Sequence, residues 1–143
     1  MDAALWPHAP VPQMDSTAWQ WQVSSVAQLP ALRAGLRACL RATCNDQDAE
    51  DPVGDRIVLA VDELASNGLR HGLAPVTARI AETAHGWLID ISDRAIDHGP
   101  QPAVGRDQSL GGMGLYLVAA LTAGRGWSVV GKDKHVWACL SAA

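Results

Sequence analysis

The stretch DELASNGLRHG, residues 62–72, spaces three polar side chains four residues apart: Glu63, Asn67 and His71. Residues at i and i+4 lie on the same side of an α-helix, so these three share one face. An asparagine oxygen can bind Mg²⁺ together with phosphate oxygens and water, and a glutamate one turn earlier can accept a proton. The alternative is a solvated helix face, on which His71 is favoured because it lies near the helix C-terminus. The stretch alone does not separate these two interpretations.

The surrounding sequence places this face on an amphipathic helix. Residues 52–72 end at a glycine that suits a helix C-cap, and they carry an apolar stripe of Ile57, Val61, Leu64 and Ala65. A second helix is expected over residues 29–44, where Pro30 suits the first turn and leucines recur at helical spacing. We interpret its basic stripe as a solvated face rather than a partner site; the stripe consists of Arg33, Arg37 and Arg41.

Alternating apolar and polar residues predict five strands, over residues 18–24, 75–83, 86–93, 125–131 and 135–141. The last two form a hairpin around the turn KDK, residues 132–134. A further helix, opened by glycines, is expected over residues 112–123. This order of elements predicts an α+β fold, a two-layer α/β sandwich with a mixed, mainly antiparallel sheet and helices on one face.

Composition favours one folded domain. The chain has 143 residues, of which 48% are hydrophobic and 18% charged, as in globular proteins. Residues 1–16 contain three prolines without periodicity, so we expect a flexible N-terminal arm followed by a single domain over residues 17–143. The net charge of −4 and the scattered Lys and Arg residues argue against direct nucleic-acid binding, which needs clustered positive charge.

The expected location is the cytoplasm, without membrane attachment. The N-terminal stretch lacks the basic start and continuous apolar core of a signal peptide, and no apolar run reaches the length of a membrane span. Three cysteines without CxxC spacing predict reduced thiols rather than a disulfide framework or a metal site.

A second polar feature is LIDISDR, residues 88–94, in which Asp90 and Asp93 lie at the end of an apolar strand. A partly buried carboxylate at position 93 can accept a hydrogen bond from the exocyclic amine of adenine. Guanine carries a carbonyl at that place, and leaving such a buried group unpaired costs about 1–3 kcal/mol. The alternative is an aspartate that only forms the turn after the strand.

The third feature is SLGGMGLYLVAAL, residues 109–121, in which glycines 111, 112 and 114 precede an apolar helix. Glycine lets the backbone approach a ligand, and free N–H groups at a helix start can bind phosphate. A hinge before a packed helix is the alternative. The aperiodic segment before it, residues 94–111, is too long for an ordinary loop, so we expect a lid that becomes ordered when nucleotide binds.

In this order, the three features resemble the GHKL (Bergerat-fold) ATP-binding family. ELASNGLRHG is similar to the family's N-box, ELxxNxxxHG; DISD, residues 90–93, is similar to the G1 box; and GGMGLYLV is similar to the G2 box, GxGLxLV. The resemblance covers residues 18–140. Within the family, the short length and the ending most resemble the anti-sigma-factor serine/threonine kinases (RsbW-like).

The resemblance implies a role for each residue that matches the motifs. Asn67 would bind Mg²⁺, Glu63 would be the catalytic general base, and Asp93 would bind the adenine of ATP. His71 would contact phosphate.

The remaining site residues belong to the glycine-rich segment and the lid. Gly112, Met113 and Gly114 would surround the phosphates, and Arg106 in the lid would stabilise charge on the transferred group. A solvated loop arginine is the alternative for Arg106.

The resulting hypothesis is a homodimeric kinase that phosphorylates an anti-sigma-factor antagonist and otherwise holds a sigma factor. The departure from the family lies in the G1 box, where Asp93 is followed by Arg94, Ala95 and Ile96 instead of glycines. The alternative function is therefore a catalytically degenerate member of the family that sequesters a sigma factor or another regulator.

Overall fold

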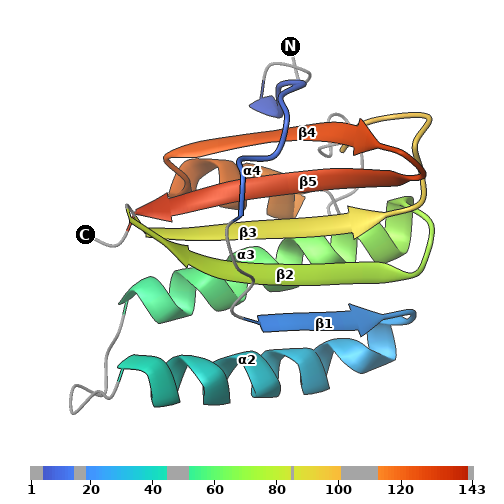
Figure 1. Cartoon of the computed structure of the whole chain (residues 1–143). Coiled ribbons are helices and arrows are strands. Elements are labelled where there is room, and N and C mark those ends of the chain that lie inside the picture. Colours follow the sequence, from blue (N-terminus) through green and yellow to red (C-terminus); the bar gives the residue numbers. More distant parts are fainter. Residues whose placement is uncertain (1–4, 15–18, 45–51, 85, 101–112, 142–143) are drawn as a thin grey trace.

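The computed structural model describes residues 5–14, 19–44, 52–84, 86–100 and 113–141. Its centre is one five-stranded sheet in which every neighbouring pair of strands is antiparallel, in the order β1-β2-β3-β5-β4 (Figure 1). The strands are β1 (Trp19–Val23), β2 (Val76–Thr83), β3 (Gly86–Asp93), β4 (Gly124–Val130) and β5 (Asp133–Ser141). A short 3-10 helix, η1 (Val26–Gln28), leads from β1 into the first long helix.

Three helices cover one face of this sheet (Figure 1): α2 (Leu29–Cys44), α3 (Pro52–His71) and α4 (Met113–Leu121). The expected apolar stripe of α3 is confirmed, because Ile57, Val61, Leu64 and Ala65 are at most 2% exposed. They pack against the alternate residues of β3 that point towards the helices, Ile89 and Ile91. This packing confirms the predicted α+β sandwich with helices on one face.

The turn between β4 and β5 differs from the prediction. The structure places the turn at Gly131 and Lys132, and Gly131 adopts a φ of +62°. β5 therefore begins at Asp133, and Lys134 is a strand residue paired with Asp93 and Val129. The predicted KDK turn was one to two residues too late, because glycine adopts this left-handed conformation more readily than the charged residues that follow it.

The N-terminal segment, expected to be a loose arm, makes specific contacts over residues 5–9. Ala9 N–H donates to the carbonyl of Trp127 at 2.9 Å, and Trp127 N–H donates to the carbonyl of Pro7 at 3.0 Å, so the segment adds to the β4 edge of the sheet. Trp6 is 1% exposed, and its indole N–H donates to the carbonyl of Leu115 in α4 at 3.3 Å. A buried tryptophan with a satisfied N–H ties this segment to the domain.

Within the described residues, no helix combines the length and apolar character that crossing a bilayer requires. Cys39 and Cys139 are free thiols.

Candidate functional site

The three polar residues of α3 lie on the last three turns of the helix. Glu63 is half-buried, and burial raises the pKa of its carboxyl group; the neighbouring Asp62 raises the pKa further, whereas Arg70 lowers it. His71 is the last residue of α3, and its Nε2 atom is buried. A glutamate whose pKa is raised in this way holds a proton more readily than one in water, which suits a general base.

Asn67 lies one turn after Glu63, and its Oδ1 atom is buried without a hydrogen-bond partner in the described part of the chain. Leaving a buried amide oxygen unpaired costs free energy, so such an atom in a folded protein calls for an explanation. The described residues contain no group of three His, Cys, Asp or Glu side chains that could hold a metal ion. The orphaned oxygen nevertheless fits Mg²⁺, because this ion needs only one or two protein ligands when phosphate and water supply the rest.

The start of α4 lies directly against Glu63. A Cβ atom added at Gly114 would lie 1.9 Å from Glu63 Oε2, a distance that no real side chain tolerates. Only glycine therefore allows the first turn of α4 to approach the carboxylate of α3 so closely. Because the first turn of a helix presents backbone N–H groups that favour phosphate, the start of α4 is a candidate phosphate site beside Glu63.

At the other end of α3, Asp93 lies beneath the helix terminus. Its side chain is 3% exposed, and Oδ1 accepts a hydrogen bond from the backbone N–H of Ala95 at 2.7 Å. A Cβ atom added at Gly72 would lie 2.6 Å from both Cγ and Oδ2 of Asp93, and one at Gly68 would lie 3.5 Å from Oδ2. Gly72 thus lets the end of α3 close over the carboxylate, whereas the distance at Gly68 is an ordinary van der Waals contact.

The structure adds Lys134, a residue that the sequence interpretation missed. It is the partner of Asp93 in the β3–β5 pairing; its Nζ atom lies 3.6 Å from Asp93 Oδ2, and its side chain is 3% exposed. Burial lowers the pKa of Lys134, whereas its charge interaction and hydrogen bonding with Asp93 raise it. The prediction placed Lys134 in a turn, where a lysine points into solvent; only the correct position of the turn reveals its place beside Asp93.

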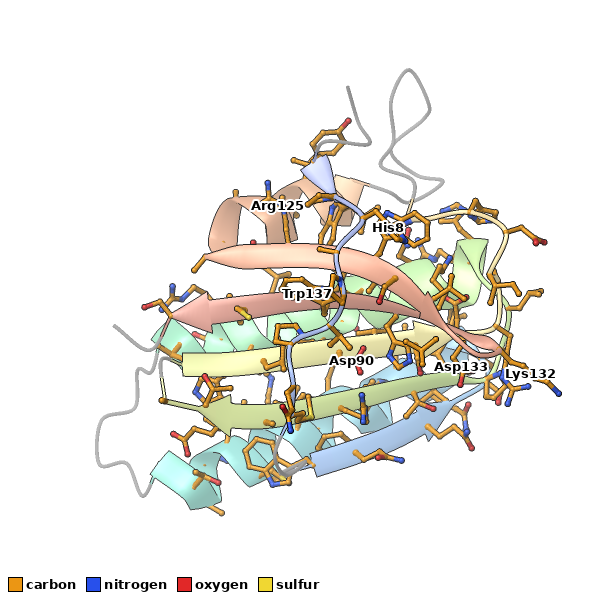
Figure 2. The ribbon with its side chains drawn as sticks, turned by 45° about the horizontal axis from the view of Figure 1, so that its top comes forward. His8, Asp90, Arg125, Lys132, Asp133 and Trp137 are labelled. Atoms are coloured by element: carbon orange, nitrogen blue, oxygen red, sulfur yellow. The ribbon has the colours of Figure 1, made fainter. Side chains whose placement is uncertain are left out.

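Asp90, the other aspartate of the same strand, lies on the opposite face of the sheet (Figure 2). It is fully buried and accepts hydrogen bonds from Arg79, through Nε at 3.2 Å and through Nη2, and from His135 Nδ1 at 2.9 Å. The hydrogen bond with Asp90 raises the pKa of His135. Since strand residues three apart point to opposite faces, Asp90 does not belong to the site at Asp93.

Some predicted site residues lie outside the described residues. These are Arg106 and Gly112, together with residues 101–111 of the lid expected over residues 94–111. Met113 begins α4, but its side chain also lies outside the described part. The structure brings Glu63 and Gly114 together at one end of the site and Asp93 with Lys134 at the other.

The two ends are separated along α3. From Glu63 to Gly72, at 1.5 Å per residue, the helix rises about 13 Å. This length is on the scale of an extended nucleotide, with the carboxylate of Asp93 suited to a base and the start of α4 suited to phosphates. Asn67 lies between them along the helix.

A comparison with protein families identifies the family of this fold. Residues 23–138 match the histidine kinase-like ATPase domain; this range includes every helix, strands β2 to β4, the last residue of β1 and most of β5. A search among curated proteins found no match. The chain therefore belongs to the histidine kinase-like ATPase family, and its fold is that of an ATP-binding domain of the GHKL type.

Proposed function

We propose that the protein is a regulatory serine/threonine kinase that transfers the γ-phosphate of ATP to an anti-sigma-factor antagonist. The observation that carries the proposal is the contact between Glu63 and the start of α4, one turn from the orphaned oxygen of Asn67. This contact puts a candidate base next to a candidate phosphate site. The identity of the partner is supported by the resemblance of ELASNGLRHG and GGMGLYLV to the motifs of anti-sigma-factor kinases.

In the proposed reaction, the hydroxyl oxygen of the acceptor serine or threonine attacks the γ-phosphorus of ATP. Glu63 accepts the hydroxyl proton, and the bond between the γ-phosphorus and the bridging oxygen breaks, so that ADP leaves with that oxygen. The raised pKa of Glu63 increases its affinity for the proton.

The other residues of the chain position the nucleotide. Backbone N–H groups at the start of α4, around Gly114, would bind phosphate oxygens, and Asp93 would accept a hydrogen bond from the base. Asn67 Oδ1 would hold Mg²⁺, which neutralises charge on the phosphates when it is bound. We further propose a cytoplasmic homodimer that holds a sigma factor while the antagonist is phosphorylated.

One observation favours the second candidate function, a sequestering module without catalysis. Asp93 already has an amide and an ammonium group within reach, and Ala95 and Asp97 stand where the family's DxGxG motif has glycines. A base must compete with these groups for the carboxylate. If the base cannot displace these groups, nucleotide does not bind, and the fold would serve only to bind a regulator by its surface.

The test is transfer of radiolabelled phosphate from ATP to each candidate antagonist, run beside capture of a sigma factor. We compare the wild type with Glu63→Gln, which keeps the size of the side chain but removes the base. The variant is expected to transfer phosphate about 10²–10⁴-fold more slowly. Its affinity for ATP should stay close to that of the wild type, because Glu63 acts on the acceptor hydroxyl.

Two results would decide against the kinase. Capture of a sigma factor by a wild-type protein that transfers no phosphate would favour the sequestering module. Equal transfer rates for the wild type and Glu63→Gln would remove Glu63 from the role of base.

A further inference from the structure

The base-binding end of the site contains two opposite charges where the sequence interpretation expected one. Asp93 and Lys134 face each other across β3 and β5, and each side chain is 3% exposed. The Nζ atom of Lys134 and the Oδ2 atom of Asp93 lie 3.6 Å apart, so a donor and an acceptor stand side by side at this end of the site. The Oδ1 atom of Asp93 is occupied by Ala95, which leaves Oδ2 beside the ammonium group as the oxygen that can serve a ligand.

A carboxylate alone distinguishes the two purines. It accepts a hydrogen bond from the exocyclic amine of adenine. Guanine has a carbonyl oxygen at that position, and this oxygen and the carboxylate repel each other because both carry negative charge. A donor beside the carboxylate changes this comparison. Adenine offers a donor at its amine and an acceptor at ring N1; guanine offers an acceptor at its carbonyl and a donor at ring N1–H.

We propose that Lys134 makes the site tolerant of both purines, because it donates to adenine N1 or to the guanine carbonyl while Asp93 accepts from the other position. This inference rests on the proposed nucleotide site. An acceptor and a donor that lie side by side can therefore pair with both purines. With adenine, the carboxylate contacts the amine and the ammonium group contacts N1; with guanine, the carboxylate contacts N1–H and the ammonium group contacts the carbonyl. The preference for adenine that Asp93 alone would impose is then largely removed.

The structure also explains how Lys134 can be present at all. A buried lysine is costly without a partner, and Asp93 supplies one across the strand pair. Lys132 is a matched control: it lies two residues away, at the exposed turn between β4 and β5 (Figure 2). A change at Lys132 alters the charge of the chain by the same amount without touching the base-binding end.

The experiment is titration calorimetry with the Mg²⁺ complexes of ATP, GTP and inosine triphosphate. The inosine base has the carbonyl of guanine but lacks its exocyclic 2-amino group, so it separates the effect of the carbonyl from the effect of fitting that amino group. In the wild type, ATP and inosine triphosphate are expected to bind within about fivefold of each other, because each finds both contacts.

Lys134→Met removes the donor at similar length. The variant should bind GTP and inosine triphosphate more weakly relative to ATP, by about tenfold or more. The carbonyl of the base then faces the carboxylate without the ammonium group that compensates for it. Lys134→Gln keeps a donor and should retain most of the tolerance. Lys132→Met should leave the ratio of affinities unchanged.

Three results would overturn the inference. A wild type that prefers ATP over inosine triphosphate by more than about a hundredfold contradicts it even if the variants fail to fold. The inference also fails if Lys134→Met still binds ATP and keeps the wild-type ratio of affinities for ATP and inosine triphosphate. In both cases the proposed nucleotide site survives. A wild type that binds none of the three nucleotides overturns the proposed function together with this inference.

Discussion

Asp90 and Asp93 lie three residues apart on β3, both are nearly inaccessible to solvent, and each lies beside a cation, yet they have different surroundings. Asp90 lies on the face without helices, where Arg79 and His135 donate to both of its oxygens. Asp93 lies beneath α3 with one amide hydrogen bond and one ammonium group at 3.6 Å. A buried carboxylate with a complete set of donors stabilises the fold, whereas one with spare capacity can bind a ligand.

The same contrast separates other polar groups on the two faces. Under the helices, Asn67 Oδ1 is buried without a hydrogen-bond partner among the described residues, and Glu63 is pressed against the start of α4. On the face without helices, here called the open face, the described part of the N-terminal segment covers the sheet near Trp137 (Figure 2). The indole N–H of Trp137 donates to the carbonyl of Ala9 at 3.0 Å. The buried oxygen of Asn67 and the approach of Glu63 to α4 both lie on the helix side, where we propose the nucleotide site.

The largest expected effect on stability is at Asp90. Asp90→Asn leaves Arg79 and His135 without their anion, and removing one partner of a buried ion pair is strongly destabilising. Because the side chain of Arg79 is 32% exposed, we expect a loss of about 2–3 kcal/mol rather than the full value for a buried pair. Urea denaturation would measure it. An unchanged midpoint would show that the open-face cluster does not support the fold.

A smaller effect is expected at Asn67. Asn67→Ala deletes an amide oxygen that has no hydrogen-bond partner, so the free energy of unfolding should change by no more than about 1 kcal/mol. Binding of ATP should instead lose most of its dependence on Mg²⁺, which titrations with and without the ion would show. If Asn67→Ala is as destabilising as Asp90→Asn, then Asn67 is structural and the contrast between the two faces fails.

The smallest effect is a pH dependence that comes from the open face. The hydrogen bond with Asp90 raises the pKa of His135 in the folded protein, although Arg79 opposes it. His135 therefore contributes its full stabilisation below the unfolded pKa of about 6.5, and this contribution is lost as pH rises through the raised folded value. Thermal unfolding from pH 5.5 to 8.5 should show the loss in the wild type and not in His135→Ala. A curve with the same slope in both proteins would exclude His135 as its source.

The sequence predicts the fold well because its strong signals are local. The apolar stripe of α3 and the alternating residues of β2 and β3 predict the ends of these elements to within one or two residues. The two sides of β3 also follow from strand periodicity, which places Asp90 and Asp93 on opposite faces. The order of the strands in the sheet, in contrast, depends on contacts between distant segments and is visible only in the structure.

The site was predicted only in part, for a similar reason. Glu63, Asn67 and Gly114 stand in short motifs, whereas Lys134 stands in none and reaches Asp93 only through the pairing of β3 with β5. A turn placed at KDK instead of at Gly131 and Lys132 was enough to conceal it. Trp6 was missed as well, because a single tryptophan among prolines gives no periodic signal, although it is buried against α4.

The most direct test of the contrast is the affinity for Mg²⁺-ATP of two matched variants, Asp93→Asn and Asp90→Asn, measured by titration calorimetry below their unfolding temperatures. Both replace a buried carboxylate on the same strand with an amide of the same size. We predict that Asp93→Asn weakens ATP binding by about tenfold or more, whereas Asp90→Asn stays within about twofold of the wild type in spite of its lower stability. Equal losses of affinity in the two variants, or a loss only in Asp90→Asn, would contradict the assignment of the nucleotide site to the helix-covered face.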